Sequence, residues 1–302
     1  MQNKNMKTWL SATLSILFLS ACTARVNWEW SGDPVPSLDK ETADLADVAT
    51  DAIKLAEKIG NEQVLMVFDI DNTLLAMEQG LGADQWYEWQ KALANHDRCS
   101  DQNVGDRFAV QGAVYFASAM RPTQKDGPTQ VKAIQDKGIS VIALTSRGPD
   151  YRLQTFRELR RNGFRFGVSA IGPSGGYDGE FMPVKDGRMS RYEDGVFMTA
   201  GQHKGEMLHA LLKKTGTEMP AVIVMADDKQ ENLDAIKETF DSLGVPVHTW
   251  RYSGEDEFVE NFDPEQADAQ WKSIEQSLRQ IQQTLGPDNY DLSSAIPPTD
   301  CP

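Results

Sequence analysis

Acidic and hydroxyl side chains stand at the ends of three apolar runs in this chain. The stretch VLMVFDIDNTLL carries Asp69 and Asp71, VIALT ends at Thr145, and AVIVMADD ends at Asp227 and Asp228. Unbroken apolar runs of this length fit strands that are buried on both faces of a parallel sheet. The polar residues would then lie at the carboxyl ends of the strands, the edge at which open α/β sheets bind ligands.

The acids at these strand ends form a candidate metal group. Asp69, Asp71 and Asp227 in one crevice would repel one another strongly unless a divalent cation neutralised them. Oxygen-only ligation with several open positions suits Mg²⁺. Asp228 is a weaker candidate than Asp227, because Asp228 and Glu231 have the spacing of a helix capping box.

Each pattern taken alone also has a purely structural interpretation. Asp69 and Asp71 fit a turn of solvated acids or a helix N-cap, and Thr145 fits a cap of the next turn. Lys204 opens a helix in GQHKGEML, where a cation opposes the macrodipole. An anion or a carboxylate opposite Lys204 would make that position favourable. The alternative is a solvated Lys204 that pairs with Glu206.

The alternation of apolar strands with amphipathic helices predicts an α/β fold, with a Rossmann-like core in which helices flank a parallel sheet. Besides the three strands, a short edge strand is expected at residues 245–250. The length of 302 residues fits about two domains, or one domain with sizeable insertions. Helices are expected at residues 37–60, 124–137 and 151–162, from Lys204, after Asp228, and at 267–285.

Two segments depart from this core pattern. Residues 76–121 have a helical pattern and follow the first acidic pair directly, so they predict a cap insertion. Trp86, Trp89 and Leu93 share one helical face there, and they either fill the cap core or line a substrate pocket. Residues 164–200 are rich in Gly and carry two Asp-Gly pairs, which predicts a small β-hairpin protruding beside the pocket.

In this order, the Asp-x-Asp-x-Thr pattern, Thr145, Lys204 and the Asp227-Asp228 pair resemble the four motifs of the haloacid dehalogenase superfamily of phosphotransferases. The resemblance covers roughly residues 64–250, and the cap and hairpin match by position only. Among relatives, the chain looks most similar to uncharacterised exported lipoproteins of this superfamily. It is less similar to class C acid phosphatases, whose first motif carries more acidic residues.

The resemblance implies a phosphatase that acts through an aspartyl-phosphate. Asp69 would be the nucleophile, and Asp71 would protonate the leaving oxygen and later activate water. Thr145 and Lys204 would hold and neutralise the transferring phosphoryl group.

The same resemblance implies Mg²⁺ held by Asp69, Asp71, Asp227 and Asp228, with Asp71 contributing its backbone carbonyl. Dehalogenases lack an acid at the position of Asp71, because a halide leaves without a proton. The expected reaction is therefore the Mg²⁺-dependent hydrolysis of a small phosphomonoester.

The N-terminus resembles the signal of a bacterial lipoprotein. Lys4 and Lys7 precede an apolar run too short to span a bilayer, and a Leu-Ser-Ala-Cys tetrad ends at Cys22. Residues 1–21 would then be removed and Cys22 would be acylated. An ordinary secretory signal with an incidental Cys22 is the alternative.

Export has further implications for the chain. Residues 22–37 are expected to form a tether. Thr23, rather than an Asp, follows Cys22. In the lipoproteins that the chain resembles, this favours anchoring in the outer membrane of a Gram-negative envelope, facing the periplasm. An oxidising compartment permits a disulfide between Cys99 and Cys301. This disulfide would fix the turn-rich tail 286–302 to the cap, and without it the tail is expected to be loosely held. The sequence alone leaves the pairing open.

The chain is strongly acidic, with a formal net charge of −15, and loss of residues 1–21 removes two Lys and no acid, which gives −17. Such a charge disfavours binding to nucleic acid and to anionic membrane surfaces. The expected partners are a small phosphorylated substrate and, through acylated Cys22, the lipid bilayer. The sequence makes no prediction about the oligomeric state.

Two other classes of function fit the sequence. The first is an envelope lipoprotein that keeps the fold and binds metal or a phosphorylated ligand without turnover. The second is a structural envelope protein whose cap aromatics contact a partner, so that Trp86→Ala would change an interaction and leave catalysis intact. The complete set of acids, hydroxyl and Lys favours catalysis, since an enzyme that has lost its activity tends to lose part of such a set.

Acylation of Cys22 predicts how the protein fractionates. Wild-type protein is expected in the membrane fraction, because two or three acyl chains hold a protein firmly, whereas Cys22→Ala protein should be absent from it. Fractionation of cells followed by immunoblotting measures both. Recovery of most of the wild-type protein in the soluble periplasmic fraction would contradict the prediction.

Overall fold

The structure of this chain is a computed structural model, and it describes residues 35–286 and 290–301. The expected signal at 1–21, the acylated Cys22 and most of the expected tether at 22–37 lie outside these residues and stay predictions. Within the described part of the chain, no helix combines the length and the apolar character needed to cross a membrane.

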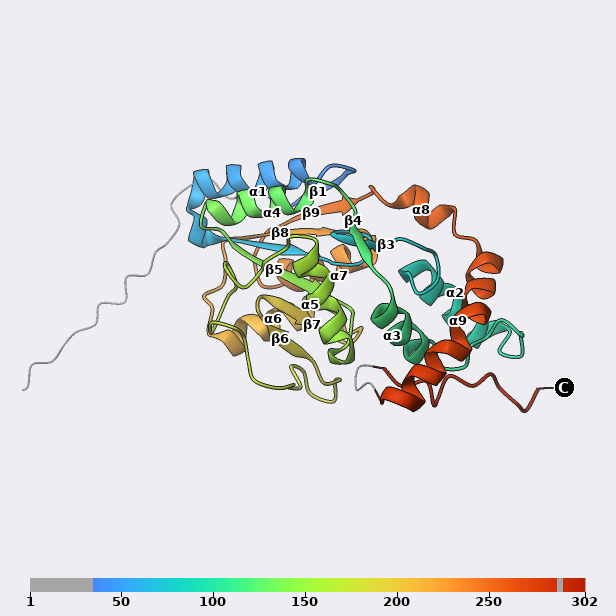
Figure 1. Ribbon diagram of the computed structural model, residues 1–302. Coiled ribbons are helices and arrows are strands. Elements are labelled where there is room, and N and C mark those ends of the chain that lie inside the picture. The colour runs from blue at the N-terminus through green and yellow to red at the C-terminus, as the bar shows by residue number, and fades with distance from the viewer. Residues whose placement is uncertain (1–34, 287–289, 302) are drawn as a thin grey trace, which may run out of the picture. The chain divides into compact units, whose positions relative to one another are not determined.

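A seven-stranded sheet forms the centre of the fold, in the order β1-β9-β8-β2-β5-β7-β6 (Figure 1). Six of these strands run parallel to one another, and the seventh, β6, is antiparallel to β7. This confirms the predicted α/β class with a Rossmann-like parallel core. The strands of the sheet are β1 (Leu38–Thr42), β2 (Val64–Phe68), β5 (Ser140–Thr145), β6 (Arg191–Glu193), β7 (Val196–Met198), β8 (Val222–Asp227) and β9 (Val247–Tyr252).

The central strand β2 is buried on both faces, as its apolar sequence predicts. Val64, Met66 and Phe68 belong to the core on one face of the sheet. Leu65 and Val67 belong to the core on the other face, because successive side chains of a strand point to opposite sides. Each core therefore takes apolar side chains from β2.

Helices cover both faces of the sheet (Figure 1). Apolar side chains of α1, α4 and α5 pack into one core, and those of α6 and α7 pack into the other. The core helices are α1 (Leu45–Ile59), α4 (Gly127–Asp136), α5 (Arg152–Arg161), α6 (Lys204–Thr215) and α7 (Gln230–Asp241), with short 3-10 turns η1 (Asn61–Gln63) and η2 (Pro149–Tyr151).

The first helix begins later than expected, because residues 38–42 form strand β1. The sequence LDKET is polar and predicts no buried strand, but β1 lies at the edge of the sheet and bonds only to β9. An edge strand can leave its side chains in water. Asp44 then caps α1 by accepting a hydrogen bond from the backbone N–H of Ala46 at 2.9 Å. The expected edge strand at 245–250, which is β9, is consequently an inner strand.

The expected hairpin forms, but it extends the main sheet and does not protrude from it. β6 and β7 are joined by a turn in which Asp194 and Gly195 have φ of 44° and 74°. This left-handed conformation at both central residues suits a two-residue hairpin. β7 pairs with β5, so the hairpin forms the last two strands of the sheet. Pairing with a distant strand is not visible in the local sequence.

The cap insertion is helical, as predicted for residues 76–121. Its elements are a two-stranded antiparallel ribbon, β3 (Leu75–Met77) with β4 (Met120–Pro122), and two helices, α2 (Asp84–His96) and α3 (Arg107–Ala117). Trp86 is fully buried, and Trp89 packs against Phe262 at 6.0 Å between ring centroids. These rings therefore fill the core, which is one of the two interpretations that the sequence left open.

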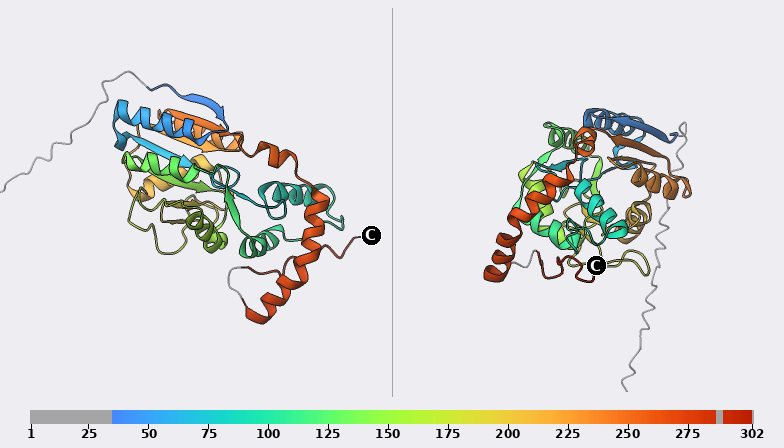
Figure 2. Two further views of the ribbon diagram at one scale, coloured as in Figure 1. Left: turned by 45° about the horizontal axis from the view of Figure 1, so that its top comes forward. Right: turned by 90° about the vertical axis from the view of Figure 1, so that its right-hand side faces the viewer.

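The C-terminal region packs against the cap. The last two helices are α8 (Asp256–Glu260) and α9 (Pro264–Leu285), and Figure 2 shows α9 beside α2 and α3 in both views. The described part of the tail is held in place, contrary to the expected loose tail. Leu292 is fully buried, and Arg279 donates a 2.7 Å hydrogen bond to its carbonyl oxygen. Ser294 Oγ also donates to Asp106 Oδ2 at 2.7 Å, across a sequence separation of 188, and contacts so far apart cannot be read from the turn-rich sequence.

Cys99 and Cys301 form a disulfide, with a Cα–Cα distance of 5.5 Å. The pairing that the sequence left open is thus confirmed, and it joins the tail to the loop between α2 and α3.

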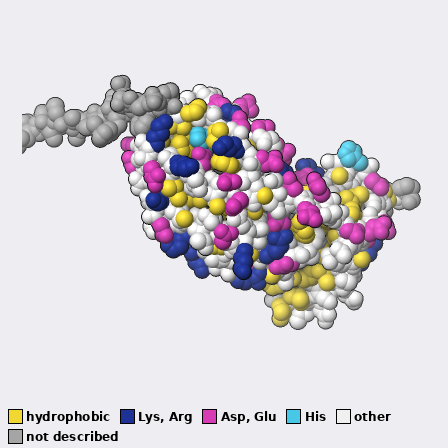
Figure 3. All heavy atoms as spheres, turned by 90° about the horizontal axis from the view of Figure 1, so that it is seen from above, with side chains coloured by type: hydrophobic (Ala, Val, Ile, Leu, Met, Phe, Trp, Pro, Cys, Tyr) yellow, Lys and Arg dark blue, Asp and Glu magenta, His cyan; other side chains and the backbone are white. Residues whose placement is uncertain are grey.

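Acidic and basic side chains are interspersed on the molecular face that Figure 3 shows.

Loss of the disulfide should destabilise the protein. The bond closes a loop with a sequence separation of 202, and removing a cross-link of this kind costs about 2–4 kcal/mol. Cys301→Ser is expected to lower the free energy of unfolding by that amount in urea titrations without reductant. Cys99→Ser should have the same effect, and the double variant should lose no more. Equal stability of oxidised wild type and Cys301→Ser would contradict this.

Candidate metal centre

Three neighbouring strands end at one edge of the sheet with the residues that the sequence singled out. Asp69 follows β2, Asp227 ends β8 on one side of it, and Thr145 ends β5 on the other. The parallel registers of β2 with β8 and with β5 bring these ends level. The sheet therefore places one carboxylate at its centre, with a second carboxylate and a hydroxyl on the two sides.

Asp69, Asp227 and Asp228 form a compact group of carboxylates. One oxygen from each lies within 4.8 Å of the others. Asp69 and Asp227 are buried, and Asp228 is half-buried. This group could hold a metal ion, as the sequence predicted for these three residues.

Lys204 lies among these carboxylates. It is the first residue of α6, and its Nζ donates to Asp69 Oδ1 at 2.5 Å and to Asp227 Oδ2 at 2.6 Å. Lys204 is 2% exposed, so the alternative of a solvated Lys paired with Glu206 is wrong. An ammonium group at the N-terminus of a helix is stabilised here by the two carboxylates opposite it.

The electrostatics of the group are dominated by burial and by like charge. Burial raises the pKa of Asp69 to about 7; Lys204 opposes this, and the charges of Asp227 and Asp71 add to it. Burial and the neighbouring carboxylates also raise the pKa of Asp228 well above its ordinary value. When all three carboxylates are ionised, the one ammonium of Lys204 leaves two negative charges uncompensated. This is the charge that a divalent cation would neutralise.

The carboxylate of Asp71 is held apart from this group by Arg147. Nη2 of Arg147 donates to Asp71 Oδ1 at 2.7 Å, and Nε donates to Oδ2 at 2.9 Å. Burial alone would raise the pKa of Asp71, but the guanidinium charge and its hydrogen bonds hold it below the usual range. The structure thus brings together the carboxylates of Asp69, Asp227 and Asp228, and it places the carboxylate of Asp71 in a bidentate ion pair. The metal ligand expected from Asp71 was its backbone carbonyl, so this ion pair does not contradict that prediction.

Arg147 is itself fixed from several sides. Its guanidinium lies 4.5 Å from the centroid of the Tyr115 ring, and its Nη1 donates to Thr155 Oγ1 at 2.9 Å. Tyr115 comes from cap helix α3 and Thr155 from core helix α5. Sequence reasoning gave Arg147 no role. The one feature of the sequence that could have indicated a role for Arg147 was its position directly after Thr145 and Ser146, at the end of β5.

Thr145 is buried at the end of β5, as predicted. Its Oγ1 accepts a 3.2 Å hydrogen bond from the backbone N–H of Arg147. Thr145 therefore does cap the next turn, which is the purely structural role that its position also fitted. The hydroxyl proton can still be donated to another group, because the oxygen acts as the acceptor in this contact.

Hydrogen bonds also fix the loops that carry the acids. Thr73 Oγ1 accepts from the backbone N–H of Asp228 at 2.9 Å, which ties the loop after β2 to the loop after β8. Asp227 Oδ1 accepts from Asn232 Nδ2 at 2.9 Å. The capping box suggested for Asp228 does not form, because α7 has Lys229 as its N-cap and no side-chain cap.

A further ion pair joins the site to the cap. Lys229 Nζ lies 2.7 Å from Asp84 and 3.4 Å from Glu88, both on α2. Burial raises the pKa of Asp84, and Lys229 acts against that rise. The first turn of the cap helix is therefore held next to the loop that carries Asp228.

The sequence matches the family described as "Protein of unknown function (DUF2608)" over residues 41–283, and the chain belongs to this family. A comparison with curated proteins found no match.

Divalent metal should stabilise the protein through Asp69, Asp227 and Asp228. At a metal concentration of about 100 times Kd, the gain in the free energy of unfolding is about 2.7 kcal/mol. Asp228→Asn should lose most of this gain, which thermal unfolding with and without Mg²⁺ or Mn²⁺ measures. Asp71→Asn is the matched control and should keep it, because its carboxylate is paired with Arg147.

The same measurement has a defined pH dependence. Stabilisation by metal should weaken as the pH falls below about 7, because the pKa of Asp69 is raised to about 7 and protons then compete with the ion. If Asp71→Asn and Asp228→Asn lost the same amount of the stabilisation by metal, the assignment of the ligands would be contradicted.

Proposed function

We propose that this protein is a Mg²⁺-dependent phosphomonoester hydrolase that acts through an aspartyl-phosphate on Asp69. The observation that carries the proposal is the group of Asp69, Asp227 and Asp228, with Lys204 bound to the two buried members Asp69 and Asp227. Its position at the carboxyl edge of a parallel sheet is the usual place for a ligand in this class of fold. The order of the motifs, which resembles that of haloacid dehalogenase phosphatases, supports the same reaction.

The donor set fits Mg²⁺ in charge and in kind. The ligands would be carboxylate oxygens of Asp69, Asp227 and Asp228, which is the chemistry that a hard cation prefers. The excess of negative charge at the group also requires a cation before a phosphate can approach. When bound, the ion would supply charge neutralisation and a fixed orientation for the phosphoryl oxygens.

Asp69 would act as the nucleophile. One of its oxygens attacks phosphorus, and the bond from phosphorus to the leaving oxygen breaks. Water then attacks the phosphorus of the aspartyl-phosphate, which releases phosphate and restores Asp69. Lys204, already within hydrogen-bond distance of Asp69, and the hydroxyl of Thr145 would stabilise the charge of the phosphoryl group during both steps.

Asp71 would transfer the protons. In the first step its carboxyl gives a proton to the leaving oxygen, and in the second its carboxylate takes one from the attacking water. The ion pair with Arg147 favours the ionised form of Asp71, which suits the second step. For the first step Asp71 must carry a proton, so we expect Arg147 to move away from it or to take the substrate as its new partner.

The site also limits the kind of substrate. Asp69, Thr145, Lys204 and Asp227 are each at most 5% exposed, and the cap is joined to the core by Lys229 and Asp84. A small phosphorylated molecule fits such a site better than a polymer. Acylation at Cys22 would place this reaction at the cell envelope, facing the periplasm.

The nucleophile gives the sharpest test of the reaction. Asp69→Asn keeps the shape of the side chain but removes its charge, so kcat should fall by about a thousandfold or more. Release of phosphate from a panel of phosphorylated metabolites with Mg²⁺ is the measurement. Asp234→Asn is the matched control, because this exposed acid on α7 bonds only to Gln230 Nε2 among the described residues.

The outcomes separate the candidate functions. Full activity in Asp69→Asn would contradict the mechanism. Stabilisation of the wild type by metal and phosphate, without turnover of any substrate, would favour the binding lipoprotein that lacks catalysis.

A further inference from the structure

A cavity of about 340 Å³ lies at the opposite end of the sheet from the metal centre. β7 runs from Val196, which pairs with Ala143, to Met198, which pairs with Thr145. The turn that contains Asp194 precedes β7 and borders the cavity, so the cavity and Thr145 lie toward opposite ends of the same strands.

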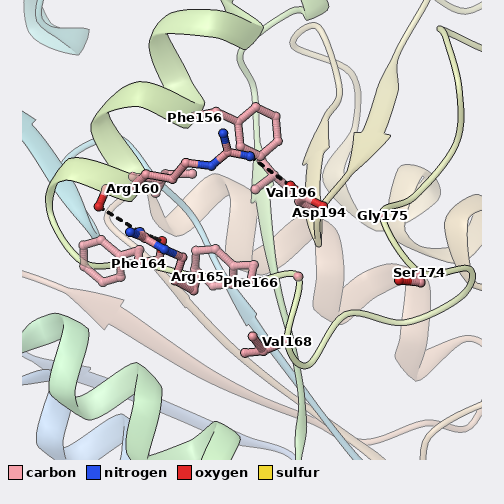
Figure 4. A pocket seen from close by; sticks show the side chains of 12 residues that line it. Phe156, Arg160, Phe164, Arg165, Phe166, Val168, Ser174, Gly175, Asp194 and Val196 are labelled. Carbon is pink, nitrogen blue, oxygen red and sulfur yellow. Dashed lines mark hydrogen bonds and ion pairs between the residues drawn. The ribbon is translucent and has the colours of Figure 1, made fainter.

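Aromatic rings form much of the wall of this cavity, as Figure 4 shows. Phe156, Phe164 and Phe166 are buried, and the rings of Phe164 and Phe166 are nearly parallel, at an interplanar angle of 7°. Val168 is 76% exposed and lines the same cavity. Of these apolar residues, Val168 offers the most surface to a ligand, because the three rings are at most 7% exposed.

The charged side chains in the lining are Arg160, Arg165 and Asp194. Arg165 donates through Nη1 to the carbonyl oxygens of Arg160 and Phe164, and it has no carboxylate partner in the described part of the chain. Arg160 pairs with Asp194 at 3.0 Å (Figure 4). Both side chains of that pair are exposed, so it contributes little stability and can exchange partners. The lining thus has a formal charge of +1 on a chain whose net charge is −15.

We propose that this cavity binds a small organic anion. Its acidic group, a carboxylate, sulfonate or phosphate, contacts the guanidinium groups of Arg160 and Arg165, which suit planar oxyanions. Its apolar or aromatic body lies against Val168 and the small exposed parts of Phe164 and Phe166. A volume of about 340 Å³ is at the lower end of ligand sites, so the ligand is a small molecule and not a polymer.

The test uses naphthalene-2-sulfonate and the full mature protein without divalent metal. This probe has an aromatic body and an anionic group, and it is not a phosphoester. Calorimetry should give saturable binding of one molecule, and neutral naphthalene-2-sulfonamide should bind at least tenfold more weakly. Binding that is equally strong for both compounds would overturn the proposal, and so would no binding.

Variants locate the probe. Arg165→Gln removes the unpaired charge, and Val168→Glu places a negative charge at an exposed position of the wall, so each should weaken binding at least tenfold. Arg188→Gln is the matched control, an exposed Arg outside the lining, and should bind as the wild type does. Equal affinity of Arg165→Gln and Arg188→Gln would overturn the proposal. Since the probe is no substrate, this result does not depend on whether the phosphatase reaction occurs.

Discussion

Buried negative charge at one edge of the sheet is the constraint on which the arrangement of this protein depends. Asp69, Asp227 and Asp228 lie within 4.8 Å of one another, and Lys204 compensates one of their three charges. Without further compensation, such a group favours protonation over ionisation, as the raised pKa values of Asp69 and Asp228 indicate. A divalent cation would remove the repulsion, and for this reason the reaction that we propose depends on a metal ion.

The surrounding structure holds this charge in place. The order of β8, β2 and β5 brings the strand ends together, and Thr73 links the loops after β2 and β8. Other ionised groups nearby are paired separately: Asp71 with Arg147, and Asp84 with Lys229. The excess charge is therefore confined to the three carboxylates. Because both pairs also contact or include cap residues, the position of the cap and the electrostatics of the site depend on each other.

The sequence predicted those features that depend on local pattern. The apolar runs predicted the buried strands, and the polar residues at their ends pointed to Asp69, Thr145 and the pair Asp227-Asp228. Lys204 was predicted from its position at the start of a helix. Features that depend on long-range pairing were missed or misplaced. β1 has the polar sequence LDKET and is a strand because β9 lies beside it. The pairing of β7 with β5, the hydrogen bond of Ser294 in the tail to Asp106 and the ion pair of Asp71 with Arg147 likewise join residues far apart in the sequence.

Direct detection of a phosphorylated Asp69 is the most direct test of this account. The Asp71→Asn variant keeps the nucleophile but cannot accept a proton from water, so the aspartyl-phosphate should accumulate on it. The variant would be mixed with Mg²⁺ and a radiolabelled phosphoester that has a good leaving group, quenched in acid and digested for peptide mapping. We predict a hydroxylamine-sensitive label on the peptide that contains Asp69, and none in the variant that also carries Asp69→Asn. Label on a Ser, Thr or His, or turnover of the wild type with no label on Asp69 in the variant, would contradict the account.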